Sequence, residues 1–323
     1  MSRPPRRPEG PRRPSSFPSP APKGRPQDRH AERPAGRPGH AAGAAPEEER
    51  PRRPRGGEAV AEPARGGRPP RGGQDASRAP REATPPNTLW LYGLHTVAAA
   101  LANPRRRFKR LLLTAEAEAA LAEKLPRPWK LQAERVERAR FQTFLTEDAV
   151  HQGAALLVEP LPPVALEDAL EKSRGTVLLL DQVTDPRNVG AILRSAAAFG
   201  AAAVVMQDRN APPETGAMAR AAVGALDTVP VVREVNLART ITVLQKAGYW
   251  VMGLDGTAKT ELAAAKPTDR PAALVLGAED SGLRRLQRET CDELVKLPIR
   301  PEMESLNVSV AAAIALYELS RGG

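Results

Sequence analysis

The 323-residue chain has very few of the residue types that bind metals or form disulfides. It contains one cysteine, Cys291, and four scattered histidines: His30, His40, His95 and His151. One cysteine cannot form an intramolecular disulfide, and the histidines form no cluster with metal-ligand spacing. We therefore expect no disulfide framework and no metal site, and a reducing compartment is the simpler location for the protein.

Long apolar runs are also absent. No run approaches the ~20 residues that span a bilayer, and the N-terminus lacks the apolar stretch of a secretory signal. The tail is rich in arginine, as transit peptides are, but it is interrupted by prolines and carries the acidic run Glu47–Glu49. We therefore expect a cytoplasmic protein that does not enter a membrane.

Several catalytic motifs are missing from residues 87–323. This part contains no Gly-x-Gly, no Gly-Lys-Ser/Thr and no Gly-x-Ser-x-Gly. These absences exclude the dinucleotide fingerprint, the glycine-rich loop of a Rossmann-type methyltransferase, the P-loop and the serine-hydrolase elbow. The sequence therefore argues against hydride transfer, a P-loop kinase and serine hydrolysis.

The first 86 residues lack the apolar side chains that a folded core needs. They hold 20 of the 34 prolines and 19 of the 48 Lys and Arg residues but 10 of the 38 acidic residues, so they carry +9 of the net charge of +10. Such a segment cannot offset about 1–2 kcal/mol of backbone entropy per ordered residue. We expect a disordered basic tail over residues 1–86. Its Arg-Gly-Gly pieces resemble segments that contact RNA phosphates, and a solubilising tail without a partner is the alternative.

The rest of the chain predicts two α/β parts. Residues 87–160 predict a small module, with helices at 94–102 and 115–124 and strands at 109–114 and 154–158. Residues 161–323 alternate apolar runs with helical stretches. The strands predicted there are 177–181, 202–206, 228–232, 249–254, 273–276 and 293–297. This alternation predicts a mostly parallel, doubly wound sheet.

Polar residues follow three of the predicted strands, where an open α/β sheet binds its ligands. The first segment, 181–190, leads into a helix predicted at 191–199, in which Arg194 lies opposite the apolar stripe of Val189, Ile192 and Ala196. Arg194 is therefore a candidate for substrate contact, and a solvated helix arginine is the alternative. Asn188 is either a site residue or an ordinary N-cap.

The other two segments surround glycine turns and a final helix. In Leu276–Leu283, two glycines permit close backbone approach to a ligand and Glu279 supplies an acceptor. Segment 297–307 precedes a helix that is apolar almost all round, which predicts burial on most sides. Ser305 and Asn307 could contribute to a site or only cap that helix.

Together, in this order and spacing, the three segments resemble the SpoU branch of the SPOUT RNA 2′-O-methyltransferases. The signatures of that family are Asn-x-Gly-x-x-x-Arg, Leu-Gly-x-Glu-x-x-Gly and Pro-x-x-x-x-x-x-Ser-Leu-Asn. Here they correspond to Asn188, Gly190 and Arg194, to Leu276, Gly277, Glu279 and Gly282, and to Pro298, Ser305, Leu306 and Asn307. The module at 87–160 is similar to the RNA-binding domain of the 23S rRNA guanosine 2′-O-methyltransferase subgroup. The short tRNA-specific members lack that module, so rRNA is favoured as the substrate.

The resemblance implies a fold, a cofactor and a set of site residues. It implies a SPOUT domain over 161–323 with a C-terminal trefoil knot, a homodimer, and S-adenosyl-L-methionine as methyl donor. The implied cofactor-binding residues are Gly277, Leu297, Ile299 and Leu306. The implied catalytic residues are Arg194, Asn188, Glu279, Ser305 and Asn307.

The role of Arg194 needs a physical qualification. The family assigns this arginine to activation of the ribose 2′-OH, but a guanidinium has a pKa above ~12 and is a poor base. It is better suited to bind the adjacent phosphate and stabilise a developing alkoxide. Two alternatives stay open at this stage: a tRNA ribose methyltransferase, and an RNA-binding ribosome-assembly protein that keeps the fold without turnover.

Overall fold

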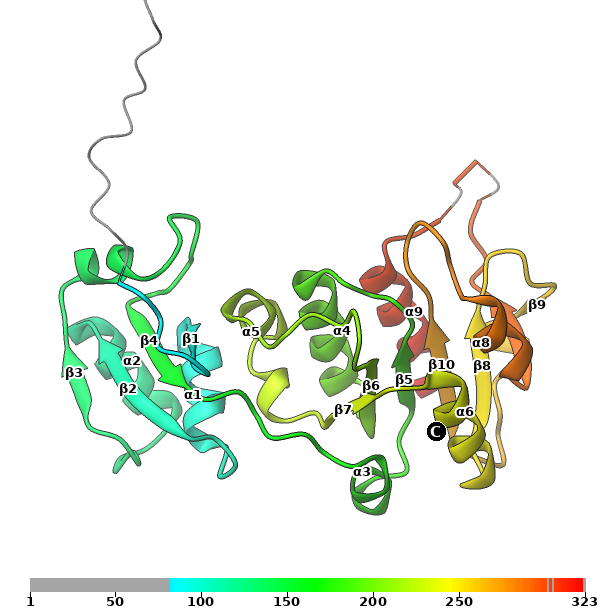
Figure 1. Cartoon of the computed structure of the whole chain (residues 1–323), viewed down its shortest axis with the longest axis horizontal. Helices are drawn as coiled ribbons and strands as arrows, with labels where there is room; N and C mark the ends of the chain where they lie inside the picture. Colours follow the sequence, from blue (N-terminus) through cyan, green and yellow to red (C-terminus); the bar gives the residue numbers. More distant parts are fainter. Residues whose placement is uncertain (1–81, 301, 304, 322–323) are drawn as a thin grey trace, which may run out of the picture. The chain divides into compact units, whose positions relative to one another are not determined.

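The computed structural model describes residues 82–300, 302–303 and 305–321, so the predictions for residues 1–81 of the tail lie outside the described residues. Figure 1 shows two β-sheets with helices packed against them. Within the described residues, no helix is long and apolar enough to cross a membrane.

The first sheet is formed by residues 89–158 and has the strand order β1-β4-β2-β3. Strand β4 is antiparallel to β1 and β2, and β3 is parallel to β2. The elements are β1 Leu89–Tyr92, α1 Leu94–Ala102, β2 Phe108–Leu113, α2 Ala115–Lys124, β3 Ala133–Arg135, the 3-10 helix η1 Arg138–Thr143 and β4 Ala154–Val158. Both predicted helices and both predicted strands are confirmed. Strands β1 and β3 were not predicted, because runs of four and three residues show too little alternation.

The second sheet has seven strands in the order β7-β6-β5-β10-β8-β11-β9, and every neighbouring pair is parallel. The strands are β5 Val177–Leu180, β6 Ala203–Gln207, β7 Val231–Glu234, β8 Trp250–Leu254, β9 Thr260–Glu261, β10 Ala272–Leu276 and β11 Glu293–Lys296. The predicted parallel sheet is therefore confirmed, and the two-residue β9 is an addition at its edge.

Helices cover both faces of this sheet, as a doubly wound fold requires. Side chains of α4 and α9 pack in one core cluster, and side chains of α3 and α6 pack in a second. Because both faces are covered, β5 and β10 are buried along their whole length. The helices are α3 Leu166–Lys172, α4 Pro186–Ala198, α5 Gly216–Ala222, the 3-10 helix η2 Ala225–Asp227, α6 Leu237–Lys246, α7 Leu262–Ala265, α8 Arg285–Thr290 and α9 Val308–Ser320.

Two predicted boundaries are wrong for local reasons. Helix α4 begins at Pro186, five residues before the predicted start, because Asp185 caps it by accepting a hydrogen bond from the Arg187 amide at 2.9 Å. Proline is favourable in the first turn, where its missing N–H costs nothing. Strand β7 begins at Val231, three residues late, because η2 and the following turn occupy the residues before Pro230.

The last helix, predicted to be buried on most sides, leaves one face exposed. Helix α9 buries Val308, Ala312 and Leu316, but three large side chains at spacings of four and three residues stay exposed: Val310 at 47%, Ile314 at 43% and Tyr317 at 54%. One face of α9 is therefore apolar and not covered by any of the described residues.

Candidate active site at the carboxyl ends of the sheet

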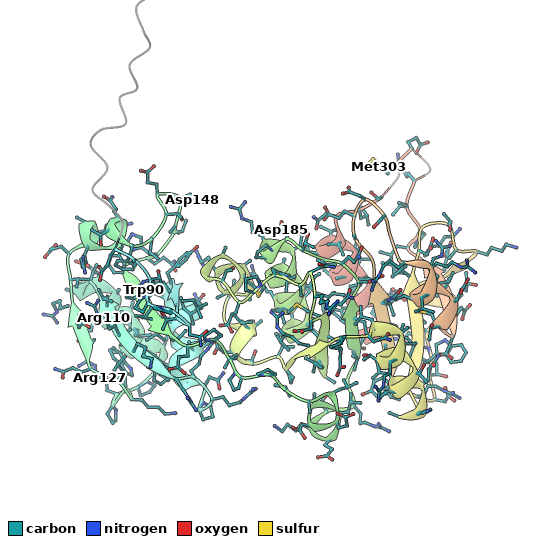
Figure 2. All side chains as sticks on the ribbon, in the orientation of Figure 1. Trp90, Arg110, Arg127, Asp148, Asp185 and Met303 are labelled. Carbon is teal, nitrogen blue, oxygen red and sulfur yellow. The ribbon has the colours of Figure 1, made fainter. Side chains whose placement is uncertain are left out.

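The three predicted site segments are the connections that follow β5, β10 and β11. Strands β5 and β10 are neighbours, and β8 alone separates β10 from β11. Because all of these strands are parallel, the three connections leave the same edge of the sheet. Figure 2 labels Asp185, at the start of α4, and Met303, in the connection before α9; Met303 lies higher in the view than Asp185.

One side chain from each connection meets in a hydrogen-bonded cluster, which we call the amide–carboxylate cluster: Asn188, Glu279 and Asn307. The Glu279 Oε1 atom accepts from Asn188 Nδ2 at 2.9 Å and from Asn307 Nδ2 at 2.6 Å. Asn307 Nδ2 also donates to Asn188 Oδ1 at 3.1 Å. These residues are up to 119 positions apart, so the three predicted polar segments form one site.

The two asparagines of the cluster were also considered as helix caps, with different outcomes. Asn188 lies inside the first turn of α4, so the N-cap alternative for Asn188 is wrong. Asn307 is the N-cap of α9, because its Oδ1 accepts from the amides of Ser309 and Val310 at 3.0 and 3.3 Å. Its Nδ2 binds the cluster at the same time. Asn307 therefore both caps α9 and links α9 to Glu279.

A cavity of about 160 Å³ adjoins the cluster and shares Glu279 with it. Four of its lining residues are those predicted to bind the cofactor, and Ser305 also lines it. The other lining residues include Leu254, Gly256, Val308 and Ala311. The prediction missed these four, although Gly256 lies two residues after a predicted strand, which was a usable signal. The four lining residues that were predicted to bind the cofactor are Gly277, Leu297, Ile299 and Leu306.

The cavity has the mixed apolar and polar lining of a small-molecule site. Leucine, isoleucine and alanine side chains supply apolar walls, while main-chain groups at its glycines and the Glu279 carboxylate supply a few polar atoms, as ligand pockets usually do. Its volume is below the roughly 300–1,000 Å³ of typical ligand pockets. A cofactor of nucleoside size would therefore be only partly enclosed.

Gly277 is required by the loop itself, a second reason for glycine beside the expected approach of a ligand. A Cβ atom at this position would lie 2.2 Å from the carbonyl carbon of Gly282 and 2.4 Å from the Leu283 nitrogen. The chain itself therefore approaches Gly277 closely, at Gly282 and Leu283. Gly282 has a φ of 63°, which L side chains rarely adopt. The two glycines close a tight turn that carries Glu279 at its tip.

Arg194 lies on α4, on the side away from the buried stripe, as predicted. Val189, Ile192 and Ala196 are fully buried, and Arg194 is exposed. Among the described residues it forms no hydrogen bond or ion pair, so the chain does not bring Arg194 into the amide–carboxylate cluster. Its guanidinium is available to a molecule that approaches from solvent.

The cysteine does not belong to the site. Burial raises the pKa of Cys291 to about 12, with a smaller contribution from Asp292, so the thiol stays protonated. The described residues also contain no group of three or more His, Cys, Asp or Glu side chains that could hold a metal ion.

Comparison with known proteins agrees with this geometry. The model of the SpoU rRNA Methylase family matches residues 175–317, and the model for RNA 2′-O ribose methyltransferase substrate binding matches residues 90–164. The 23S rRNA (guanosine-2′-O-)-methyltransferase RlmB of Vibrio vulnificus is 40% identical over 241 residues, which cover 72% of this chain and 96% of that protein. RlmB of Salmonella typhimurium is 40% identical over 243 residues, with 72% and 97% coverage.

Solved structures show the same fold. The SpoU methyltransferase AviRb from Streptomyces viridochromogenes, in complex with the cofactor AdoMet, matches with a TM-score of 0.61 at 22% identity, covering 73% of this chain and 90% of that chain. An rRNA methyltransferase from Sinorhizobium meliloti matches with a TM-score of 0.60 at 24% identity, with 73% and 87% coverage. The chain therefore has an α/β SPOUT fold. It belongs to the SpoU rRNA methylase family.

Proposed function

We propose that this protein is an S-adenosylmethionine-dependent 2′-O-ribose methyltransferase that acts on a guanosine of 23S rRNA. The observation that carries the proposal is the amide–carboxylate cluster beside an apolar cavity, assembled from all three predicted segments. The relatives named as 23S rRNA guanosine methyltransferases are 40% identical and are covered over almost their whole length, which supports the substrate.

The cavity residues would hold the cofactor. Leu297, Ile299 and Leu306 offer apolar contact, and Gly277 and its neighbours offer main-chain polar groups. When bound there, S-adenosylmethionine supplies an electrophilic methyl group for the ribose oxygen. Ser305 also lines the cavity, where its hydroxyl could bind the cofactor or the ribose.

The cluster residues would orient the reacting groups. Glu279 holds the amide groups of Asn188 and Asn307 in fixed orientations, and Glu279 itself lines the cavity. Correct placement of two reactants can contribute of order 7–11 kcal/mol to the lowering of a barrier. We assign positioning of the ribose to these residues.

Arg194 would contact the RNA. Its exposed guanidinium can bind a phosphate through two parallel hydrogen bonds and stabilise charge that develops on the 2′-oxygen. A guanidinium stays protonated at neutral pH, so a role in charge stabilisation suits it better than removal of the proton.

We also propose a homodimer that forms through α9. The exposed Val310, Ile314 and Tyr317 form an apolar stripe, and Tyr317 contacts Phe199 at the end of α4 with ring centroids 6.1 Å apart. Burying this stripe would place the helix that carries Arg194 near the interface. The resemblance to SPOUT proteins, in which two protomers contribute to the site, supports the same arrangement.

The remaining parts of the proposal concern organisation. We propose a tail over 1–86, an RNA-binding domain over 87–160 and a methyltransferase domain over 161–323. The C-terminal trefoil knot expected from the resemblance is supported by two strand insertions: β10 lies between β5 and β8, and β11 lies between β8 and β9. With RNA as substrate and a nucleoside cofactor, we expect the protein to act in the cytoplasm.

The test is transfer of labelled methyl groups from S-adenosylmethionine to RNA by the purified full-length protein. Unmodified 23S rRNA should accept one methyl group, and primer extension at limiting nucleotide should map it to the ribose of one guanosine. Loss of the same mark in a deletion strain would link the activity to the cell. Methylation of tRNA alone, or of a base, would contradict the proposal, and cofactor binding without any transfer would favour the non-catalytic RNA-binding protein.

A further inference from the structure

An ion pair between a buried carboxylate and a partly exposed arginine fixes the loop that carries Glu279. Asp181 is the first residue after β5, and its side chain is completely buried. The backbone amide of Arg284 donates to Asp181 Oδ2 at 3.1 Å. The guanidinium of Arg284 places Nε at 2.8 Å and Nη2 at 2.6 Å from Oδ1. One residue therefore satisfies both oxygens of a carboxylate that would be costly to bury unpaired.

Asp181 contacts both ends of the loop formed by residues 277–283. The Asp181 backbone amide donates to the carbonyl of Leu276, the last residue of β10, at 2.8 Å. Its side chain holds Arg284, where the loop enters α8. Residues 277–283 are therefore held between two attachments to one residue. Arg284 Nη2 also donates to Gln207 Oε1 at 3.1 Å, which adds the end of β6 to the same network.

Within these attachments the loop has little room to move. The Gly282 amide donates to the Ala278 carbonyl at 2.9 Å, and Gly277 packs directly on Gly282. Leu283 is buried, with an exposed fraction of 5%. Glu279 is exposed at the tip, yet its Oε1 accepts from the two cluster asparagines and from the Val308 amide at 3.2 Å. A shift at the base of such a closed turn would move its tip.

We propose that Asp181 and Arg284 are positioning residues for the methyl transfer, since they hold the 277–283 loop so that Glu279 meets Asn188 and Asn307 and Gly277 lines the cavity. The proposal rests on the proposed function for its effect on catalysis. The neighbouring arginine is a matched control: the Arg285 side chain is 89% exposed and, among the described residues, pairs only with Glu289, one turn along α8.

The experiment compares Arg284→Lys with Arg285→Lys in the full-length protein. Lysine keeps the positive charge, but it cannot reproduce the contacts of the guanidinium with both Asp181 and Gln207. We expect Arg284→Lys to weaken S-adenosylmethionine binding and lower kcat by about 10-fold or more, because small misplacements of reacting groups can cost up to about 100-fold. The KM for RNA should stay unchanged. Arg285→Lys should match the wild type in cofactor affinity, in kcat and in the KM for RNA.

Hydrogen exchange gives a readout that does not depend on activity. The amides of Gly282 and Val308 should exchange faster in Arg284→Lys than in the wild type, and those of the central strand β5 should not. Asp181→Asn, which preserves shape, should produce the same pattern, and it replaces Arg284→Lys if that variant does not fold. The double variant should be no worse than the more impaired single variant, because both changes remove one shared interaction.

The outcomes separate the two proposals. Wild-type kinetics and wild-type exchange in Arg284→Lys and Asp181→Asn would overturn the positioning role. A lowered melting temperature with unchanged kcat and cofactor affinity would also overturn it, since the pair would then serve stability alone. A wild-type protein that binds no S-adenosylmethionine would remove the proposed function, whereas the exchange data would still decide whether the pair holds the loop.

Discussion

Replacing Asn307 by serine or by alanine separates the two roles of its side-chain amide. The Oδ1 atom caps α9, and the Nδ2 atom donates to Glu279 at 2.6 Å and to Asn188 at 3.1 Å. Serine is as good an N-cap as asparagine, but its hydroxyl is too short to reach both partners. Alanine provides neither the cap nor the donor.

The expected magnitudes follow from these contacts. A hydrogen bond to a charged group contributes about 1.5–3 kcal/mol and a neutral one about 0.5–1.5 kcal/mol. Because Glu279 and Asn307 are exposed and water can replace part of the interaction, we reduce the sum to about 2 kcal/mol, which corresponds to roughly a 30-fold fall in kcat/KM. Both variants should show this fall. Losing the cap costs about 1 kcal/mol more, so only alanine should lower Tm further, by about 2–4 °C for a domain of this size.

An assay of methyl transfer to 23S rRNA measures the fall in kcat/KM. Thermal unfolding, followed by circular dichroism, measures the change in Tm. Ser309→Ala is a useful control, because its hydroxyl contacts the capping oxygen at 2.6 Å but not the donor side of Asn307. Wild-type kcat/KM in Asn307→Ser would refute the role of the amide–carboxylate cluster in catalysis. Equal melting temperatures for the serine and alanine variants would refute the capping role.

Three further outcomes can be measured on the same protein. Arg194→Ala should abolish methyl transfer and leave the dissociation constant for S-adenosylmethionine unchanged in calorimetry, because the residue is exposed and lies outside the cavity; near-normal turnover would contradict its assignment. Cys291, with a pKa of about 12, should resist iodoacetamide at pH 8 in the native protein and react rapidly in denaturant, since only about one thiol in 10,000 is ionised; rapid native labelling would show that the thiol is accessible. The imidazole of His151 stacks on the Phe141 ring, with centroids 4.3 Å apart, and burial lowers the pKa of His151 below its unfolded value. The neutral imidazole therefore contributes to stability above about pH 6.5, and this contribution is lost as the pH falls toward the folded-state pKa. In His151→Phe, the loss of Tm between pH 7.5 and 5.5 should be smaller than in the wild type, and an equal loss would contradict burial of a neutral imidazole.

The sequence by itself determined the local elements and the chemistry that follows them. Apolar runs bounded by turns gave six strands of the main sheet, and the 3.6-residue period of α4 separated exposed Arg194 from its buried stripe. The identity of the polar residues after β5, β10 and β11 was also readable, because strand ends and their motifs are contiguous in sequence. These signals were sufficient to name Asn188, Glu279 and Asn307 as candidates.

Only the tertiary structure decided which of these segments meet. Strand order depends on hydrogen bonds between segments that are far apart in the chain, and a local apolar pattern does not specify its neighbours. The contact of Asn307 with Glu279, the pairing of Asp181 with Arg284 across 103 positions, and the packing of Gly277 on Gly282 all follow from that order. The exposed stripe on α9 was hidden for the same reason: its sequence is apolar almost all round, and only packing in three dimensions determines which side remains uncovered.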